Sequence, residues 1–212
     1  MTTRLAVLLA SPLLLSLSGC IVVVDGQGPA SFRTDFQSGR AGPPSPAEAV
    51  LEDIEGLQAS AGTDVRVRSG GETRIVLDER AQERTTYAVE DGILEVTCRK
   101  PCGRGDRGVA TVYVQDLSSL RASSGASIRV EDALPAAQRL SVRASSGGSL
   151  DARRIEASRA EARASSGGSV RLTVTDRLDA SASSGGSVSY WGDPSVDRST
   201  SSGGSVSRRG GA

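Results

Sequence analysis

The sequence predicts an all-β chain that winds into a single-stranded parallel β-solenoid, similar in type to a right-handed β-helix. The main observation is a short phrase, Ser-Ser-Gly-Ala-Ser or Ser-Ser-Gly-Gly-Ser, which begins at Ser123, Ser145, Ser165, Ser183 and Ser201. The phrase therefore recurs at a nearly constant interval. Such a recurrence is typical of solenoids, in which each repeat is one coil that buries its apolar side against its neighbours.

Short strands are expected on both sides of each phrase, because apolar and polar residues alternate there. The positions expected to face inward before the phrase are Leu120, Val142, Ala162 and Ala180, followed two residues later by Ala122, Ala144, Ala164 and Ala182. After the phrase the alternation resumes from Ile128, Leu150, Val170, Val188 and Val206. A period of two is the pattern of a half-buried strand. The inward residues are mostly Ala, Val and Leu, which predicts a thin, flattened cross-section with little room for an internal ligand.

The glycines of the phrase are expected to form the corner between two strands of a coil. Glycine adopts positive φ without a Cβ clash, so it permits a sharp turn. The expected turn positions are Gly125, Gly147, Gly148, Gly167, Gly168, Gly185, Gly186, Gly203 and Gly204. Gly/Ser-rich tracts also occur as flexible linkers. The regular apolar flanks favour coils over a linker.

The first half of the chain is expected to hold less regular coils. The segment 57–67 matches the segment 120–130 in pattern, so the solenoid is expected to begin near Ile54. Four further strands are expected at residues 74–77, 87–90, 93–97 and 109–114. Asp91-Gly92 lies between two of them and is a strong signal for a two-residue antiparallel hairpin.

The N-terminus carries the pattern of a lipoprotein signal peptide at residues 1–19. Arg4 precedes an apolar stretch from Leu5 to Leu17, too short to span a bilayer. Leu17-Ser18-Gly19-Cys20 resembles a bacterial lipobox, in which Cys20 becomes the acylated N-terminus. The alternative is an ordinary signal peptide cut elsewhere. Residue Ile21 is not aspartate, which favours an outer-membrane location.

Three segments are therefore expected in the whole chain. Residues 1–19 form the signal peptide, and residues 20–50 form a flexible tether rich in Gly, Pro and Ser. Residues 51–212 form the solenoid, whose last coil, 196–212, is expected to be a capping or frayed repeat. The reason is that Arg198 and Arg208 fall where Ala180 and Tyr190 stand one coil earlier.

The other two cysteines, Cys98 and Cys102, are expected to form a local disulfide, the default in an exported protein. A redox-active pair is the alternative, although the spacing is not Cys-x-x-Cys. No metal site and no cofactor are expected, because two thiols in a chain without histidine cannot complete a tetrahedral zinc shell.

The charge pattern argues against two classes of protein. The formal net charge is zero, so nucleic acid is not an expected partner. No histidine is present and the acids of the repeats do not recur on one face, so no catalytic residues are assigned and the chain is not expected to be an enzyme. The many arginines that alternate with inward residues are interpreted as a solvated face rather than as a stripe that binds anions or polysaccharides.

One pair of aromatic residues, Tyr190-Trp191, is the candidate for ligand contact, because stacking on sugars needs aromatic rings and the chain has few. The alternative for Tyr190 is a bulky plug near the end of the core, since it occupies the position of Leu172 one coil earlier.

Residues 54–206 resemble the bacterial family called auto-transporter adhesin, head GIN domain. Its members carry Gly/Ser corner phrases after short alternating strands, preceded by a strand–Asp-Gly–strand segment such as Tyr87–Val96 here. The resemblance implies a parallel β-solenoid and an exported, lipid-anchored protein. This chain has Ser-Ser-Gly-Gly-Ser where many members carry Gly-Ser-Gly-Asp, so the family aspartate has no counterpart.

The expected function is that of a cell-envelope lipoprotein whose head is a non-enzymatic binding or adhesion module. Its expected partners are the membrane, through the lipid anchor, and an envelope polysaccharide or protein. The alternatives are a purely structural envelope protein and a polysaccharide-acting β-helix enzyme, which would need clustered carboxylates.

Overall fold

Fifteen strands form one curled sheet in the computed structural model, which describes residues 45–99, 102 and 108–210. The strands are β1 (Glu48–Val50), β2 (Gly56–Ser60), β3 (Asp64–Ser69), β4 (Arg74–Leu77), β5 (Thr85–Glu90), β6 (Ile93–Cys98), β7 (Val109–Val114), β8 (Ser119–Ala122), β9 (Ser127–Val130), β10 (Ala137–Ala144), β11 (Ser149–Ala164), β12 (Ser169–Ala182), β13 (Ser187–Trp191), β14 (Ser195–Thr200) and β15 (Ser205–Arg208). One short helix, α1 (Glu79–Arg84), lies between β4 and β5. The prediction of an all-β chain is confirmed.

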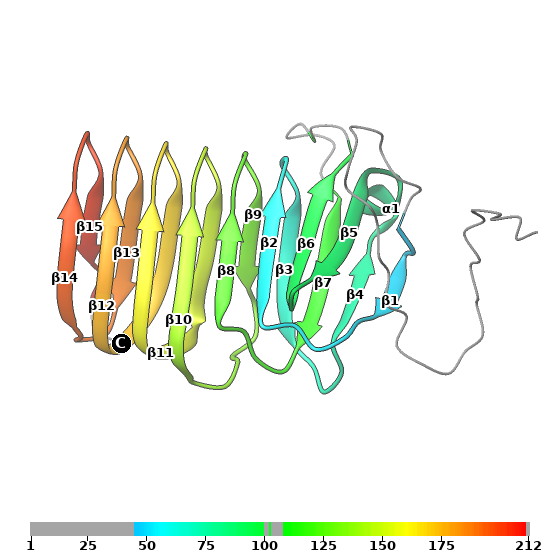
Figure 1. Ribbon diagram of the computed structural model, residues 1–212, viewed down its shortest axis with the longest axis horizontal. Coiled ribbons are helices and arrows are strands. Elements are labelled where there is room, and N and C mark those ends of the chain that lie inside the picture. Colours follow the sequence, from blue (N-terminus) through cyan, green and yellow to red (C-terminus); the bar gives the residue numbers. More distant parts are fainter. Residues whose placement is uncertain (1–44, 100–101, 103–107, 211–212) are drawn as a thin grey trace, which may run out of the picture.

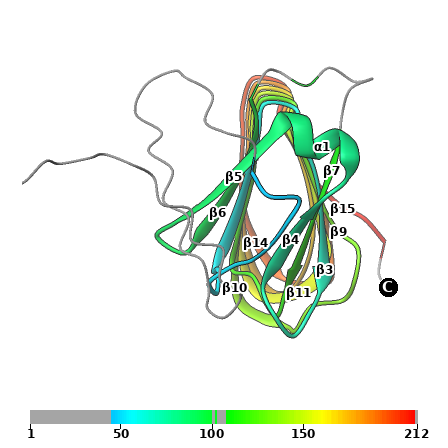
Figure 2. The same ribbon diagram turned by 90° about the vertical axis from the view of Figure 1, so that its right-hand side faces the viewer.

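The sheet is curled into two layers, which Figure 1 shows from the side and Figure 2 shows along the long axis. One layer, called here the β10 layer, contains β6, β2, β8, β10 and the second halves of β11 and β12, then β14. The other, called here the β13 layer, contains β7, β3, β9, the first halves of β11 and β12, then β13 and β15. The long strands β11 and β12 belong to both layers because they continue around the edge of the molecule.

Equivalent residues of successive repeats lie side by side in parallel pairing. Val142 pairs with Leu120 on one side and with Ala162 on the other, and Ala162 pairs with Ala180. All four are buried, as the alternation predicts. The alanines at two of these positions let the two layers approach closely, and each fully buried Val or Leu stabilises the fold by about 1.5–3 kcal/mol.

The N-terminal part is mixed, so the chain is not a uniform parallel solenoid throughout. β1 and β7 both pair antiparallel with β4, and β5 pairs antiparallel with β6. The predicted hairpin is present, with Asp91 and Gly92 both at positive φ between β5 and β6. The match between the segments 57–67 and 120–130 is also present in space, because Leu57 pairs with Leu120 and Val65 pairs with Ile128.

Strand pairing begins slightly earlier than the expected tether boundary at residue 50. Ala49 in β1 pairs with Ile75 in β4 and packs against the core. The hydroxyl of Tyr87 donates a hydrogen bond to the Pro46 carbonyl (3.1 Å). Residues 45–50 therefore close the N-terminal end of the sheet rather than acting as tether.

The corner of each coil is a tight turn, but the two glycines have different roles from those expected. Positive φ falls on the second serine and the first glycine, for example Ser146 (47°) and Gly147 (73°). The second glycine, Gly148, has ordinary φ, and a Cβ there would lie 2.4 Å from the Ala122 carbonyl oxygen of the preceding coil. The expectation that both glycines supply positive φ is thus wrong for the second one, which is needed for close approach.

The last coil is stacked in register but is open on its inner side. Val196 pairs with Leu178, Arg198 with Ala180 and Thr200 with Ala182. The three β12 residues are buried, whereas Arg198 and Thr200 are exposed. No further strand pairs with β14 or β15 in the described chain.

Candidate functional site

A groove of about 750 Å³ lies on the outer surface of the β13 layer. Its residues come from consecutive coils and include Arg129, Asp151, Arg153, Arg171, Thr173 and Trp191. Three of them form one column, since Asp151 pairs with Arg129 on one side and with Arg171 on the other. The other three, Arg153, Thr173 and Trp191, lie further along their strands, towards the edge where β11 and β12 turn into the β10 layer.

Trp191 enters the groove because β13 ends differently from the coil before it. In β12 the equivalent residue is Thr173, and the strand continues around the edge. After Trp191 the chain turns at Gly192, whose φ is 102° and whose Cβ would lie 1.9 Å from the Val174 carbonyl oxygen. Only glycine fits this close approach, so the turn places a large ring where a threonine stands one coil earlier.

Arg153 connects the tryptophan to the floor of the groove. Its guanidinium lies over the Trp191 ring, 5.0 Å from the centroid, and donates hydrogen bonds to the two carboxylate oxygens of Asp151 (2.9 and 2.8 Å). Partial burial acts to raise the pKa of Asp151, but the hydrogen bonds from Arg153 and the charges of Arg153 and Arg171 outweigh it, so this pKa lies below its ordinary value.

Two arginines of the same column, Arg129 and Arg171, make fewer polar contacts than Arg153. Neither has a salt bridge or side-chain hydrogen bond to another residue within the described ranges. At the other end of the groove Glu131 accepts two hydrogen bonds from Arg68 (2.9 and 2.8 Å) and lies 3.5 Å from Arg66. The groove therefore combines one aromatic face and several arginines with three carboxylates, of which Asp151 and Glu131 are paired with arginines and Glu156 has no salt bridge within the described residues.

The predicted aromatic pair is split by the structure. Trp191 lines the groove, whereas Tyr190 packs against the hydrophobic core in register with Leu172. Four groove residues were not predicted from the sequence: Arg129, Asp151, Arg153 and Arg171. Aligning the residue four positions after the first glycine of each phrase would have brought Arg129, Asp151 and Arg171 together.

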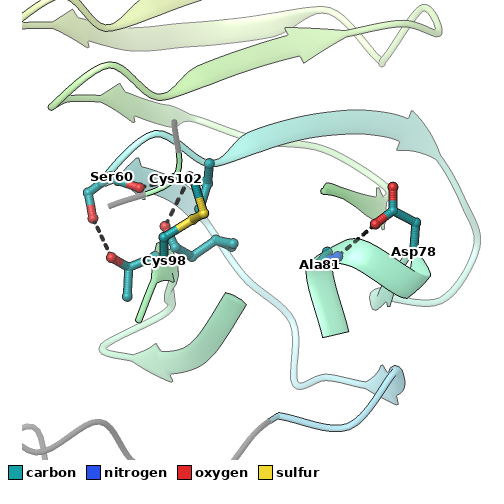
Figure 3. Close-up of a disulfide and its surroundings, with 8 residues drawn as sticks. Ser60, Asp78, Ala81, Cys98 and Cys102 are labelled. Carbon is teal, nitrogen blue, oxygen red and sulfur yellow. Dashed lines mark hydrogen bonds between the residues drawn. A yellow bond between two sulfur atoms is a disulfide. The ribbon is translucent and has the colours of Figure 1, made fainter. Parts of the chain in front are cut away.

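The other predicted site residues lie elsewhere. Cys98 and Cys102 form a disulfide, and the backbone N–H of Cys102 donates to the Ala61 carbonyl (3.2 Å), so Cys102 covers the corner of the first coil (Figure 3). Nearby, the Ser60 hydroxyl donates to Thr97 (2.9 Å), and in the same view Asp78 accepts from Ala81 at the start of α1 (2.8 Å). Cys20 lies outside the described residues.

Within residues 45–99, 102 and 108–210, no group of three or more His, Cys, Asp or Glu side chains is placed to hold a metal ion. In the same part of the chain, no helix has the length and apolar character that crossing a membrane requires.

Solved structures similar to this chain come from Bacteroides and Parabacteroides species. A putative adhesin from Bacteroides fragilis is 16% identical, with a TM-score of 0.47, and the match covers 76% of this chain and 94% of that one. A putative adhesin from Parabacteroides distasonis is 13% identical, with a TM-score of 0.41, covering 76% and 95%. A putative lipid binding protein from the same species is 16% identical, with a TM-score of 0.32, covering 80% and 98%.

Among curated proteins, none matches the chain. The family model described as "Putative auto-transporter adhesin, head GIN domain" matches residues 53–138 and 134–194. These ranges cover well over half of the chain and include β2 to β13. The protein therefore belongs to the auto-transporter adhesin head GIN domain family.

Proposed function

We propose that the protein is a non-enzymatic binding module of the cell envelope and that its groove holds a saccharide against Trp191. The observation that carries this proposal is the Trp191 ring, held by Arg153 at one end of a groove with polar walls. An indole ring offers a flat apolar face to a sugar ring. Arg129, Arg171 and Thr173 are placed to hydrogen-bond the sugar hydroxyls or an acidic substituent.

The state of Asp151 supports binding rather than hydrolysis. Glycoside hydrolysis generally uses two carboxyl groups, one of which stays protonated to act as an acid. Asp151 has a lowered pKa because Arg153 holds its ionised form, and Glu131 is paired with two arginines. Asp151 therefore does not suit the role of a general acid.

The head is proposed to be a β-solenoid displayed by a lipid anchor. Parallel pairing of equivalent residues from β2 to β15 supports the solenoid. The Leu17–Cys20 lipobox pattern and residue Ile21 support acylation at Cys20 and an outer-membrane location. The family description as an adhesin head supports a module that acts at the cell surface or in the envelope.

A glycan array probed with the full chain in non-ionic detergent tests the proposal. We expect the Trp191→Ala variant to bind these glycans about ten- to hundredfold more weakly, because the stacking face is removed. Each factor of ten corresponds to about 1.4 kcal/mol of binding free energy. The matched control is Tyr113→Ala. Tyr113 also stacks with an arginine, Arg74 at 4.1 Å, but lies on β7, several strands from β13.

Two outcomes would count against the proposal. Equal losses in the two variants would show that the Trp191 groove is not the site. Absence of binding to any glycan by the unchanged chain would favour a structural role in the envelope.

A further inference from the structure

The outer surface of the β10 layer, opposite the Trp191 groove, carries arginines aligned across neighbouring strands. Arg139 in β10 pairs with Arg159 in β11, and Arg159 pairs with Arg177 in β12. These three residues are called here the arginine ladder. A second row, Arg121, Arg143 and Arg163, runs parallel to it four residues further along the strands. Neighbouring members of a row lie one strand spacing apart, about 4.8 Å in the backbone.

The arginine ladder is poorly neutralised by the protein itself. Arg139 and Arg177 have no salt bridge within the described residues, and Arg159 is 3.6 Å from the exposed Asp176. The second row is better compensated, because Glu161 pairs with both Arg143 and Arg163. Like charges directly opposite one another on adjacent strands destabilise a sheet. The fold therefore keeps three aligned cations exposed to solvent although their mutual repulsion destabilises the sheet.

A column of hydroxyls and carboxylates lies beside the ladder. Ser119, Ser141, Glu161 and Asp179 are paired in this order across β8, β10, β11 and β12. Together with the ladder they line a groove of about 430 Å³ whose floor contains Leu140 and Ala160. Asp179 has no salt bridge within the described part of the chain. The groove runs across the strands, along the long axis of the molecule.

We infer that this groove binds a linear acidic polysaccharide, at a second site distinct from the Trp191 groove. Arginine suits carboxylate, sulfate or phosphate groups because its planar fork can donate two hydrogen bonds to one of them. A polymer that carries an acidic group on successive sugars can contact successive members of the ladder. Its hydroxyls can donate to Asp179 and exchange hydrogen bonds with Ser119 and Ser141.

The adjacent acids argue against a membrane surface as the partner. The headgroups of an anionic bilayer form a broad negative plane, which would approach Glu161 and Asp179 as closely as the arginines. A single polymer chain can lie along the ladder and use the carboxylates as hydrogen-bond acceptors. The geometry also changes the interpretation of the arginines as a merely solvated face, because register aligns them in a row with a groove beside it.

Binding of the full chain in non-ionic detergent to polygalacturonate and to dextran sulfate, at several salt concentrations, tests this inference. The test variant is Arg139→Gln/Arg159→Gln/Arg177→Gln. The control, Arg80→Gln/Arg198→Gln/Arg209→Gln, removes the same charge from exposed arginines of α1, β14 and the residues after β15. Neutral dextran and vesicles of phosphatidylglycerol and phosphatidylcholine serve as comparison ligands.

We expect the ladder variant to bind at least one of the two acidic polymers tenfold or more weakly, with a smaller dependence on salt, and the control variant to lose less than threefold. The loss caused by the ladder substitutions is expected to be the same in a Trp191→Ala background, because the two grooves have different lining residues on different layers. Thermal melts at low salt check that the variants are folded. The ladder variant should melt no lower than the unchanged protein, because the repulsion between the three arginines is removed.

Several results would overturn the inference. They are equal losses in the two triple variants, vesicle binding as tight as polymer binding, and no binding to either acidic polymer. Loss of polyanion binding in Trp191→Ala alone would assign the acidic ligand to the first groove. That outcome would remove the second site while supporting the proposed function.

Discussion

Single glycine residues determine how the chain turns in each coil and how closely neighbouring coils approach one another. Gly147 and Gly148 are adjacent and chemically identical, yet one supplies positive φ and the other makes room for a carbonyl oxygen of the preceding coil. From the sequence, both glycines are predicted to have the same role in the turn. The distinction depends on the neighbouring coil, one full repeat away in the sequence, and so is not visible in the phrase itself.

The first prediction concerns Asp151 and pH. Its folded-state pKa lies below the ordinary carboxyl value of about 3.9, so folding favours the ionised form. The resulting stabilisation is fully present above that ordinary value and is lost as pH falls through the folded-state pKa. We expect Asp151→Asn to destabilise the protein by a constant amount between about pH 5 and pH 7, and by progressively less below about pH 4.

Urea unfolding of both proteins from pH 3 to pH 7 measures this difference. Asp193→Asn is the control, since Asp193 is 85% exposed. A difference between Asp151→Asn and the unchanged protein that stays constant down to pH 3 would show that Arg153 does not hold the ionised carboxylate.

At the scale of elements, the repeated half of the chain was predictable and the first half only partly so. Strands 74–77 and 109–114 and the Asp91-Gly92 hairpin follow from local alternation and turn chemistry, and the structure contains all of them. The order β1–β4–β7 could not be predicted, because these strands carry no repeated phrase that aligns them. The two grooves were missed for a related reason: their residues come from different coils and are brought together only by register.

The second prediction compares an internal coil with the last one. A Cβ at Gly186 would lie 2.4 Å from the Ala164 carbonyl oxygen, and one at Gly204 would lie 2.1 Å from that of Ala182. The local clash is similar, but the last coil has exposed residues at its inner positions and can detach with little loss. We expect Gly186→Ala to cost about 3 kcal/mol and Gly204→Ala less than about 1 kcal/mol of global stability.

Thermal melts and hydrogen exchange in β14 decide between these outcomes. We expect faster exchange in β14 for Gly204→Ala, with a nearly unchanged melting temperature. Equal falls in melting temperature would mean that the last coil is an integral part of the cooperative unit. No fall in either variant would instead mean that the phrases behave as flexible linkers.

The third prediction concerns the disulfide between Cys98 and Cys102. The bond closes a loop of only a few residues, so on the chain-entropy model it contributes about 2 kcal/mol at most. We expect no free thiol from this pair in protein isolated without reductant, and a loss of stability of about this size in Cys98→Ser/Cys102→Ser. Titration of two reactive thiols in the folded, untreated protein would contradict the expectation.

At the scale of the whole molecule, the described chain begins at one end of the stack and the last coil lies at the other (Figure 1). β1 and β4 lie at the first end, and β14 and β15 form the second. An anchor at Cys20 would therefore attach the irregular end and leave the regular coils, with both grooves, further along the axis. This arrangement suits a head that meets a ligand away from the membrane.

The fourth prediction tests that anchor. Because Leu17-Ser18-Gly19-Cys20 ends the apolar stretch, we expect Cys20→Ala to abolish incorporation of labelled fatty acid and to release or mislocalise the protein. Cys98→Ser/Cys102→Ser is the control, since these cysteines lie far from the lipobox in sequence and should not affect labelling. Unchanged labelling of Cys20→Ala would contradict acylation at this residue.

The parallel register of the coils determines which deletions the repeated part of the chain can accommodate. Removing residues 165–182 would join Ala164 to Ser183, keep every later phrase intact and shorten the stack by one strand spacing, about 4.8 Å. Removing one residue more or fewer would turn every later side chain of the coil to the opposite face. Removing a whole coil therefore preserves the register and shortens both grooves, whereas the smaller differences in coil length already present in the chain are accommodated at the edge, where the pairing of β11 with β12 shifts register.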